Sequence, residues 1–258
     1  MASPIIDITT DGHVHTRLCH HAVGEMEDYV ETALRAGLRR IIFLEHYETG
    51  ISYFECTWLT DDDFAFYHEE GRRLAAKYQG LIDVGVGVEV GANPERFGET
   101  IDFLRRYKWQ RIGLSYHYVR HGDVFVNVVS RRKINLGLME KIGFATVADA
   151  YFDGLKQAIE VIPANVVCHL DAVLRHCSNF SLAERHVAAL RTILSSMRKR
   201  KVALEVNTSG FALRNHPFPA PWIVREAMDM GVSLVAGSDA HRPEDVGRFF
   251  ERLPALVA

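Results

Sequence analysis

The stretch I41-I42-F43-L44-E45-H46 carries the pattern that decides the fold, a short apolar run that ends in charged or polar side chains. Four consecutive apolar residues, three of them β-branched or aromatic, are typical of a strand that is buried on both faces, as in a parallel sheet. Amphipathic patterns over residues 25–36 and 61–79 predict a helix on either side of this strand, and each is followed by a glycine that suits a helix C-terminus. A strand between two helices is the repeating unit of an α/β fold.

The same pattern recurs along the whole chain. Further strands are expected over residues 5–10, 82–89, 111–115, 165–168, 202–206 and 233–236, and further helices over 94–107, 146–162, 181–200, 221–230 and 243–253. Seven strand–helix units predict a parallel sheet with helices outside it, as a closed barrel or an open doubly wound sheet. The glycines of residues 85–91 lack the dinucleotide-binding spacing that would favour the open sheet. Residues 118–145 are the least regular and are expected to form a long loop or lid.

Composition excludes several classes of protein. With 258 residues, of which 48% are hydrophobic, the chain is long enough for one large domain with a sizeable core. Its net charge of −3 gives no general attraction to nucleic acid or to an anionic membrane, and no apolar run is long enough to span a bilayer. The four cysteines have no regular spacing, and the N-terminal residues lack the basic and apolar regions of a signal peptide. We therefore expect free thiols and a cytoplasmic location.

Metal-ligand side chains follow every predicted strand. They are His13 and His15, Glu45 and His46, Glu89, His117, His169 and Asp171, Glu205 and Asn207, and Asp239 and His241. Two residues at i and i+2 in an extended backbone face the same side, and in a parallel barrel the C-terminal ends of the strands meet at the face that carries the active site. So many imidazoles and carboxylates would repel one another without a cation. The pattern therefore predicts a divalent metal such as Zn, Mn or Fe.

The remaining polar clusters have simpler explanations. His68 and His186 lie in predicted helices and are interpreted as surface or hydrogen-bonded residues, and the loop histidines 121, 176 and 216 as structural or solvated ones. The basic run at 198–201 closes a helix, where cations complement the helix dipole, so it does not indicate a nucleic-acid site.

Taken in order, eight short motifs resemble those of the polymerase-and-histidinol-phosphatase (PHP) family, and within it those of the monofunctional histidinol-phosphate phosphatases. The motifs are DGHVHT, LCHHA, EH at 45–46, GVGVEVG around Glu89, SYHYV around His117, CHLD around His169, EVNTSG around Asn207 and GSDAH around Asp239. The resemblance implies a distorted (β/α)7 TIM-like barrel, a single domain over residues 1–258, and a trinuclear centre of divalent ions.

The same resemblance assigns the ligands residue by residue. His13, His15, Glu89 and Asp239 would hold one metal; Glu89 would bridge to a second, completed by His117 and His169; His21, His46 and His241 would hold the third. Glu89, Asp239 and His241 would be the catalytic residues among them. Asp171 would orient a ligand. His20 could replace His21 as a ligand or face the substrate.

Two positions depart from the subfamily pattern. Glu45 stands where an aspartate is usual before the histidine, and Tyr118-Val119-Arg120-His121 replaces a short H-F-I-D type motif. The second segment is expected to shape the substrate pocket, so the substrate is less firmly predicted than the chemistry.

The predicted reaction is hydrolysis of a small phosphate ester, L-histidinol phosphate above all, by attack of a metal-bridging hydroxide. Arg214, Arg175 and Arg242 follow strand-end motifs and are candidates to bind the phosphate. The alternatives are a phosphatase for another small ester or a nucleotide and, more distantly, a non-catalytic metal-binding or docking barrel. No partner for the histidinol amine is assigned, no nucleic-acid or membrane partner is expected, and the oligomeric state stays open.

Overall fold

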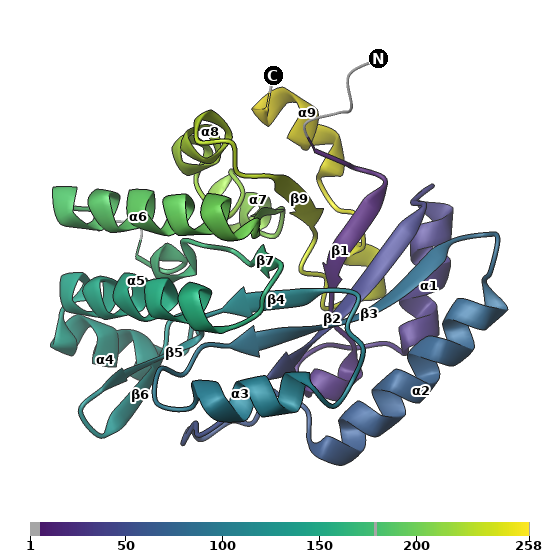
Figure 1. Ribbon diagram of the computed structural model, residues 1–258, viewed down its shortest axis with the longest axis horizontal. Coiled ribbons are helices and arrows are strands. Elements are labelled where there is room, and N and C mark those ends of the chain that lie inside the picture. The colour runs from purple at the N-terminus through teal and green to yellow at the C-terminus, as the bar shows by residue number, and fades with distance from the viewer. Residues whose placement is uncertain (1–5, 178–179, 258) are drawn as a thin grey trace.

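Seven parallel strands form the central sheet, in the order β1-β2-β3-β4-β7-β8-β9 (Figure 1). The structure, a computed structural model, describes residues 6–177 and 180–257. The strands are β1 (Thr10–Val14), β2 (Arg40–Tyr47), β3 (Asp83–Gly91), β4 (Ile112–Ser115), β7 (Val166–Val167), β8 (Ala203–Asn207) and β9 (Leu234–Gly237). The His15 amide donates to the Ala240 carbonyl, and the Asp239 amide to the His13 carbonyl, each over 2.9 Å. These bonds join β1 to the chain after β9, so the sheet is a nearly closed barrel.

Helices cover the outside of this barrel (Figure 1). The longer connecting helices are α1 (Met26–Arg35), α2 (Asp61–Lys77), α3 (Phe97–Leu104), α5 (Phe144–Val161), α6 (Glu184–Arg200) and α8 (Pro221–Asp229). Two shorter helices, α7 (Gly210–Arg214) and α9 (Leu253–Leu256), lie in the C-terminal part of the chain. The predicted single-domain, distorted (β/α)7 barrel is confirmed, and the open sheet is excluded. Among the helices within residues 6–177 and 180–257, none has both the length and the hydropathy of a transmembrane span.

Alternation along the strands separates two apolar layers. Ile41 and Phe43 are fully buried in the main core, which lies between the sheet and the helices. The residues between them face the other way: Ile42 and Leu44 form a small separate cluster with Val166, Cys168 and Ala203. This second cluster fills the inside of the barrel and forms an apolar floor beneath the polar strand ends.

The first strand lies further along the chain than predicted, over Thr10–Val14 instead of residues 5–10. The Asp7 carboxylate accepts hydrogen bonds from the Thr9 amide over 2.8 Å and from the hydroxyls of Thr9 and Thr10 over 2.7 Å each. These bonds fold the segment before Thr10 into a turn. His13 therefore lies within the strand and not after it. Residue 5 lies outside the described residues.

The segment 118–145 is not the long loop that we expected. It forms a hairpin of β5 (Tyr118–His121) and β6 (Val124–Asn127), then helix α4 (Lys133–Ile142) and the start of α5. The hairpin turns at Gly122, whose φ of 59° suits a two-residue loop. The side chain of Asn135 on α4 accepts a hydrogen bond from the Asn127 amide over 3.0 Å, which ties the helix to the hairpin.

Several helix boundaries also differ from the prediction; α3, for example, runs over Phe97–Leu104 instead of residues 94–107. Helix α6 begins at Glu184 and not at Ser181, because Nδ1 of His186 accepts the hydrogen bond of the Ala183 amide over 3.0 Å. The expected helix over 243–253 is broken into the 3-10 turns Pro243–Asp245 and Phe250–Arg252 before α9. Gly247 and Phe249 interrupt it with left-handed φ values of 68° and 60°.

Candidate metal centre and active site

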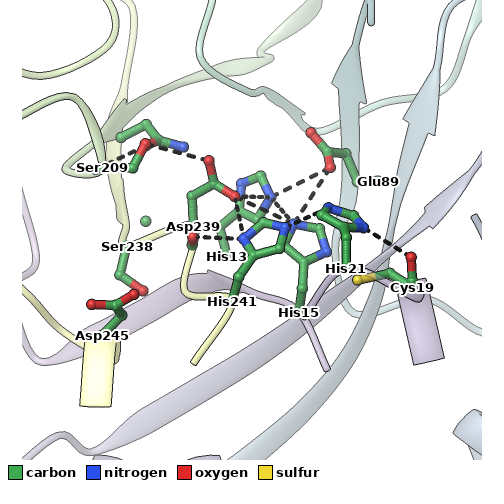
Figure 2. A network of polar contacts seen from close by, with 12 residues as sticks. His13, His15, Cys19, His21, Glu89, Ser209, Ser238, Asp239, His241 and Asp245 are labelled. Atoms are coloured by element: carbon green, nitrogen blue, oxygen red, sulfur yellow. Dashed lines mark hydrogen bonds and ion pairs between the residues drawn. The ribbon is translucent and has the colours of Figure 1, made fainter. Parts of the chain in front are cut away.

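The predicted ligands gather around Glu89 at the C-terminal end of the barrel. Oε2 of Glu89 lies 3.5 Å from Nε2 of His13 and 3.6 Å from Nε2 of His15. The same oxygen lies 2.9 Å from Nδ1 of His46. Figure 2 shows His13 and His15 turned toward the same region as the carboxylates of Glu89 and Asp239. One oxygen of Glu89 is therefore shared by imidazoles from β1 and β2.

The second oxygen of Glu89 faces a different pair of imidazoles. Oε1 lies 2.8 Å from Nε2 of His169 and 3.4 Å from Nε2 of His117, and it accepts a short hydrogen bond from the Ser115 hydroxyl. A carboxylate with separate partners on its two oxygens has the arrangement of a bridging ligand. The geometry agrees with the predicted role of Glu89 between two metal positions.

Asp239 lies beside His13 and His15, and His241 lies beside His21. Oδ1 of Asp239 lies 3.9 Å from Nε2 of His13 and 3.5 Å from Nε2 of His15, and these two ring nitrogens are 2.9 Å apart. Nε2 of His241 lies 2.8 Å from Nε2 of His21.

His46 lies between two of the predicted groups. Its ring stacks on that of His15 with centroids 4.1 Å apart, while its Nδ1 contacts Glu89. Its ligand atom can be grouped with those of His15, Cys19 and His241, or with those of Glu89 and His117. The structure therefore does not assign His46 to a single ligand set, whereas the prediction placed it with His21 and His241. The thiol of Cys19, which was not a predicted ligand, lies close to the ligand atoms of His15, His46 and His241.

Strained turns direct two of these side chains. His169 and Asp239 have left-handed φ values of 25° and 52°, which non-glycine residues rarely adopt and which recur at functional sites. The His169 amide donates to Oε2 of Glu205 over 3.0 Å, and the Asp239 amide donates to the His13 carbonyl. The turns after β7 and β9 are thus held by bonds to the barrel itself.

The two central carboxylates are ionised because imidazoles surround them. Burial acts to raise the pKa of Glu89, but His117, His13 and His46 hold it well below its usual range. Burial acts in the same way on Asp239, and His15, His13 and His241 hold the pKa of that carboxyl well below its usual range as well. Both groups therefore offer full negative charge to a cation.

The imidazoles fall into two electrostatic classes. Burial lowers the pKa of His117, but Glu89 and Glu48 outweigh it and raise the pKa to about 10. Carboxylates also raise the pKa values of His13 and His15 against the effect of burial. The pKa values of the remaining cluster are lowered, chiefly by burial and by the neighbouring His15; this cluster is His21, His46 and His241.

Several buried lone pairs at the centre have no hydrogen to accept. Oε2 of Glu89 is fully buried, and although Nδ1 of His46 lies 2.9 Å away, no hydrogen bond of suitable angle reaches this oxygen among the described residues. Nδ1 of His13 is engaged by Glu205 at 2.6 Å, so in the neutral ring Nε2 carries the lone pair that faces His15 and Asp239. Once an ion has displaced the protons of these rings, the converging nitrogen and carboxylate lone pairs are the donor set that Zn, Mn or Fe accepts. The residues present therefore fit divalent metals.

A cavity of about 880 Å³ opens beside these residues. His46, His117, His169, Asp239 and His241 form its inner wall. The outer wall includes Tyr118 and Asn127 of the hairpin, together with Ser130, Arg131 and Arg132 that follow it, and His176. The segment after His117 thus shapes the pocket, as expected. His176 also lines the pocket, where its Nε2 lies 3.0 Å from the Val129 carbonyl oxygen, so the expected structural contact is present.

Of the three predicted phosphate-binding arginines, Arg175 lines the cavity. Its Nη1 lies 3.9 Å from Oδ2 of Asp239. Arg214 is held elsewhere: its Nη2 donates to both Asp171 oxygens over 3.0 and 2.8 Å, and its guanidinium lies 3.7 Å from the centre of the Phe218 ring. Arg242 is 65% exposed in its side chain and does not line the described part of the cavity.

His20 is exposed, with a left-handed φ of 65°, and is likewise not part of the described cavity wall. Its neighbour His21 is at the wall. The two histidines that the sequence left ambiguous therefore differ in position, since His21 lies at the cavity wall and His20 does not.

Sequence reasoning missed Arg131, Arg132 and Arg248 at the cavity wall. Arg132 is paired with Glu55, and Arg248 with Asp245 at 3.1 Å. The consecutive arginines at 131 and 132 were visible in the sequence, but the segment was interpreted as a long loop or lid without assigned contacts.

Comparison with known proteins decides the family. A family model described as the PHP domain matches residues 11–209. The chain belongs to the PHP family. A second model, described as PHP-associated, matches residues 223–254 of this PHP protein, which carry Asp239 and His241. The resemblance drawn from the eight motifs is therefore confirmed at the level of the family.

Relatives and solved structures agree with this family. A probable histidinol-phosphatase of Deinococcus radiodurans is 31% identical over 245 residues, covering 92% of this PHP chain and 88% of the relative. The histidinol-phosphatase of Bacillus subtilis is 27% identical over 258 residues, covering 93% and 96%.

Two crystal structures share the fold of this PHP chain. A candidate histidinol phosphatase of Listeria monocytogenes has a TM-score of 0.86 at 23% identity, covering 94% of this chain and 99% of that one. The histidinol phosphate phosphatase of Lactococcus lactis, complexed with Zn, L-histidinol and phosphate, has a TM-score of 0.79 at 20% identity, covering 96% and 92%.

Proposed function

We propose that this PHP protein hydrolyses L-histidinol phosphate to L-histidinol and inorganic phosphate, in histidine biosynthesis, with residues 1–258 acting as one phosphoesterase domain. Curated relatives that align over most of their length are histidinol-phosphatases, so the chain is a phosphoric monoester hydrolase. The observation that carries the proposal is the convergence of imidazoles on both oxygens of Glu89, beside a cavity into which Arg175 faces. A cytoplasmic location remains a prediction from the sequence.

Three divalent ions are proposed, held as the family pattern implies. The ligands would be His13, His15, Glu89 and Asp239 for the first, Glu89, His117 and His169 for the second, and His21, His46 and His241 for the third. When bound, such ions lower the pKa of water and neutralise charge on phosphoryl oxygens. A related solved structure contains Zn, and imidazole with carboxylate also accepts Mn and Fe.

The chain itself would bind and orient the phosphate ester. Arg175 presents guanidinium donors to the cavity next to Asp239, and a guanidinium matches phosphate oxygens in a two-pronged geometry. Asp171 would act at a distance from the substrate: besides its bonds to Arg214 it accepts one from the Ala220 amide over 3.0 Å. It therefore ties the turn after β7 to the loop before α8, and neither of these partners is a proposed metal ligand.

Release of phosphate from L-histidinol phosphate tests the proposal, with nucleotides and sugar phosphates assayed beside it at saturating Zn or Mn. We expect the highest kcat/KM for L-histidinol phosphate. No phosphate release from this ester by fully metal-loaded protein would overturn the proposal.

The alternative, a phosphatase for another small ester or a nucleotide, is favoured by one observation. Arg131 and Arg132 lie on the cavity wall beyond the segment 118–121 that departs from the subfamily pattern, and Arg132 is already paired with Glu55. Extra cations suit a substrate with a second anionic group. Faster hydrolysis of a nucleotide or a bisphosphate in the same panel would support this reading.

A further inference from the structure

Two buried carboxylates outside the proposed ligand set contact the outer nitrogens of two ligand rings. Oε1 of Glu205 lies 2.6 Å from Nδ1 of His13, and Oε1 of Glu48 lies 2.8 Å from Nδ1 of His117. Glu205 is 1% exposed and Glu48 7%. Both rings turn their other nitrogen, Nε2, toward Glu89. Each carboxylate therefore holds the back of a ring whose front faces the centre.

These contacts span a strand that lies between the two partners. Glu48 follows β2 and His117 follows β4, and β3 lies between those strands in the sheet. Glu205 lies on β8 and His13 on β1, and β9 lies between them where the barrel closes. In a parallel sheet the side chain of the intervening strand would normally block such a contact.

Glycine occupies the crossing point in both cases. A Cβ atom built on Gly91, the last residue of β3, would overlap the carboxylate of Glu48. A Cβ atom on Gly237, the last residue of β9, would overlap Oε1 of Glu205 and would lie 2.8 Å from Cβ of His13. Glycine within a strand commonly marks a close approach of another group. Here the group that approaches the glycine is a carboxylate that contacts an imidazole on the far side of the strand.

Other bonds fix the Glu205 carboxylate before any ion binds. The second oxygen of Glu205 accepts hydrogen bonds from the His169 amide and from Nδ2 of Asn207, each over 3.0 Å. One carboxylate thus orients the His13 ring and the turn that carries His169, which are proposed to hold different ions.

We infer that Glu48 and Glu205 are positioning residues of the metal centre, and that Gly91 and Gly237 are the openings that let them cross to their histidines. Each carboxylate keeps the proton on Nδ1, so that the Nε2 lone pair is free and aimed at the ion. Outer partners of this kind set the orientation and basicity of metal-ligating histidines. The inference rests on the proposed metal centre and makes no use of the identity of the substrate.

The test measures metal binding directly. The variants are E48Q, E205Q, G91A and G237A, and the controls are E251Q, at a side chain that is 72% exposed, and G98A, where an added Cβ meets open space. The dissociation constants for Zn and Co are measured by competition with a chelator. The visible spectrum of the Co-loaded protein reports ligand geometry at saturation. Thermal unfolding of the metal-free forms separates folding from binding.

We expect metal affinity to fall by about 10- to 100-fold in all four variants, with an altered Co spectrum, and to stay unchanged in both controls. We also expect the double variant G91A/E48Q to bind no more weakly than E48Q alone, because both changes remove one contact. If a change at Gly237 or Glu205 prevents folding, the Gly91 and Glu48 variants carry the test.

Wild-type affinity and spectrum in E48Q, or fully additive losses in G91A/E48Q, would overturn the inference. A wild-type protein that binds no divalent ion would overturn it together with the metal centre. A wild-type protein that binds metal but does not hydrolyse L-histidinol phosphate would overturn only the proposed substrate, because the binding test contains no substrate.

Discussion

Replacement of Arg175 by alanine should weaken the recognition of the phosphate ester, whereas replacement of Arg242 by alanine should not. The side chain of Arg175 is 20% exposed and lines the cavity, and its nearest carboxylate oxygen, on Asp239, is 3.9 Å away, beyond hydrogen-bond distance. Its donors are therefore available to a ligand. The side chain of Arg242 is 65% exposed, and it is not part of the cavity wall that the described residues form.

The magnitude follows from the kind of contact that Arg175 would lose. A hydrogen bond to a charged group contributes about 1.5–3 kcal/mol, and about 1.4 kcal/mol corresponds to a factor of ten in rate. Loss of one such contact predicts a fall in kcat/KM of roughly 10- to 150-fold. R175K should recover part of the loss, because lysine retains the charge without the two-pronged geometry.

The assay is steady-state phosphate release from L-histidinol phosphate, with metal content measured for each variant so that a lost ion is not mistaken for a lost phosphate contact. Inhibition by inorganic phosphate gives a second readout, and its inhibition constant should rise in R175A. Equal kcat/KM in R175A and the wild type, or equal losses in R175A and R242A, would refute the reasoning.

Three further outcomes are expected. R214M should lower the free energy of unfolding, measured by chemical denaturation, by about 3 kcal/mol, because it leaves the fully buried Asp171 without its partner. A KM raised more than about tenfold would contradict this purely structural role. Binding of Zn to the metal-free protein near neutral pH should release protons, because the pKa of about 10 keeps His117 charged until an ion displaces its proton. Calorimetric enthalpies of Zn binding that are the same in buffers of different ionisation enthalpy would argue against this proton release. H20N, which keeps a residue that tolerates a left-handed φ, should leave metal content and kcat/KM within about twofold of the wild type, and loss of an ion would return His20 to the ligand set.

The proton on His117 also has a consequence for stability. Because the folded-state pKa of this imidazole is raised, its contribution to stability is fully present below the unfolded pKa of about 6.5 and is lost as the pH rises through about 10. The metal affinity should change in the opposite direction over the same range, since the ion competes with the proton.

Local sequence was sufficient for the repeating units and for the ligand-bearing strand ends. Runs such as 41–44 are apolar on both faces, and between two amphipathic helices such runs are typical of interior strands of a parallel sheet. Since every strand of a parallel barrel ends on the same side, residues that follow separate strands could be assigned to one site without coordinates. The first strand was misplaced because the hydrogen bonds of Asp7 compete with the apolar pattern at 5 and 6.

Contacts between distant segments could not be read in this way. Arg214 and Arg175 occupy comparable positions after strand-end motifs, yet one is held by Asp171 and the other faces the cavity. The crossings of Glu48 over Gly91 and of Glu205 over Gly237 depend on side-chain directions across three strands. Strand periodicity is a property of neighbouring residues, so the sequence by itself determined the parallel strand–helix repeat, its polar face and the chemistry of its ligands, whereas closure into a barrel depends on bonds between β1 and the chain after β9. Which arginine faces the substrate and which carboxylate supports which imidazole are set by distances between segments far apart in the chain, and only the tertiary structure decided them.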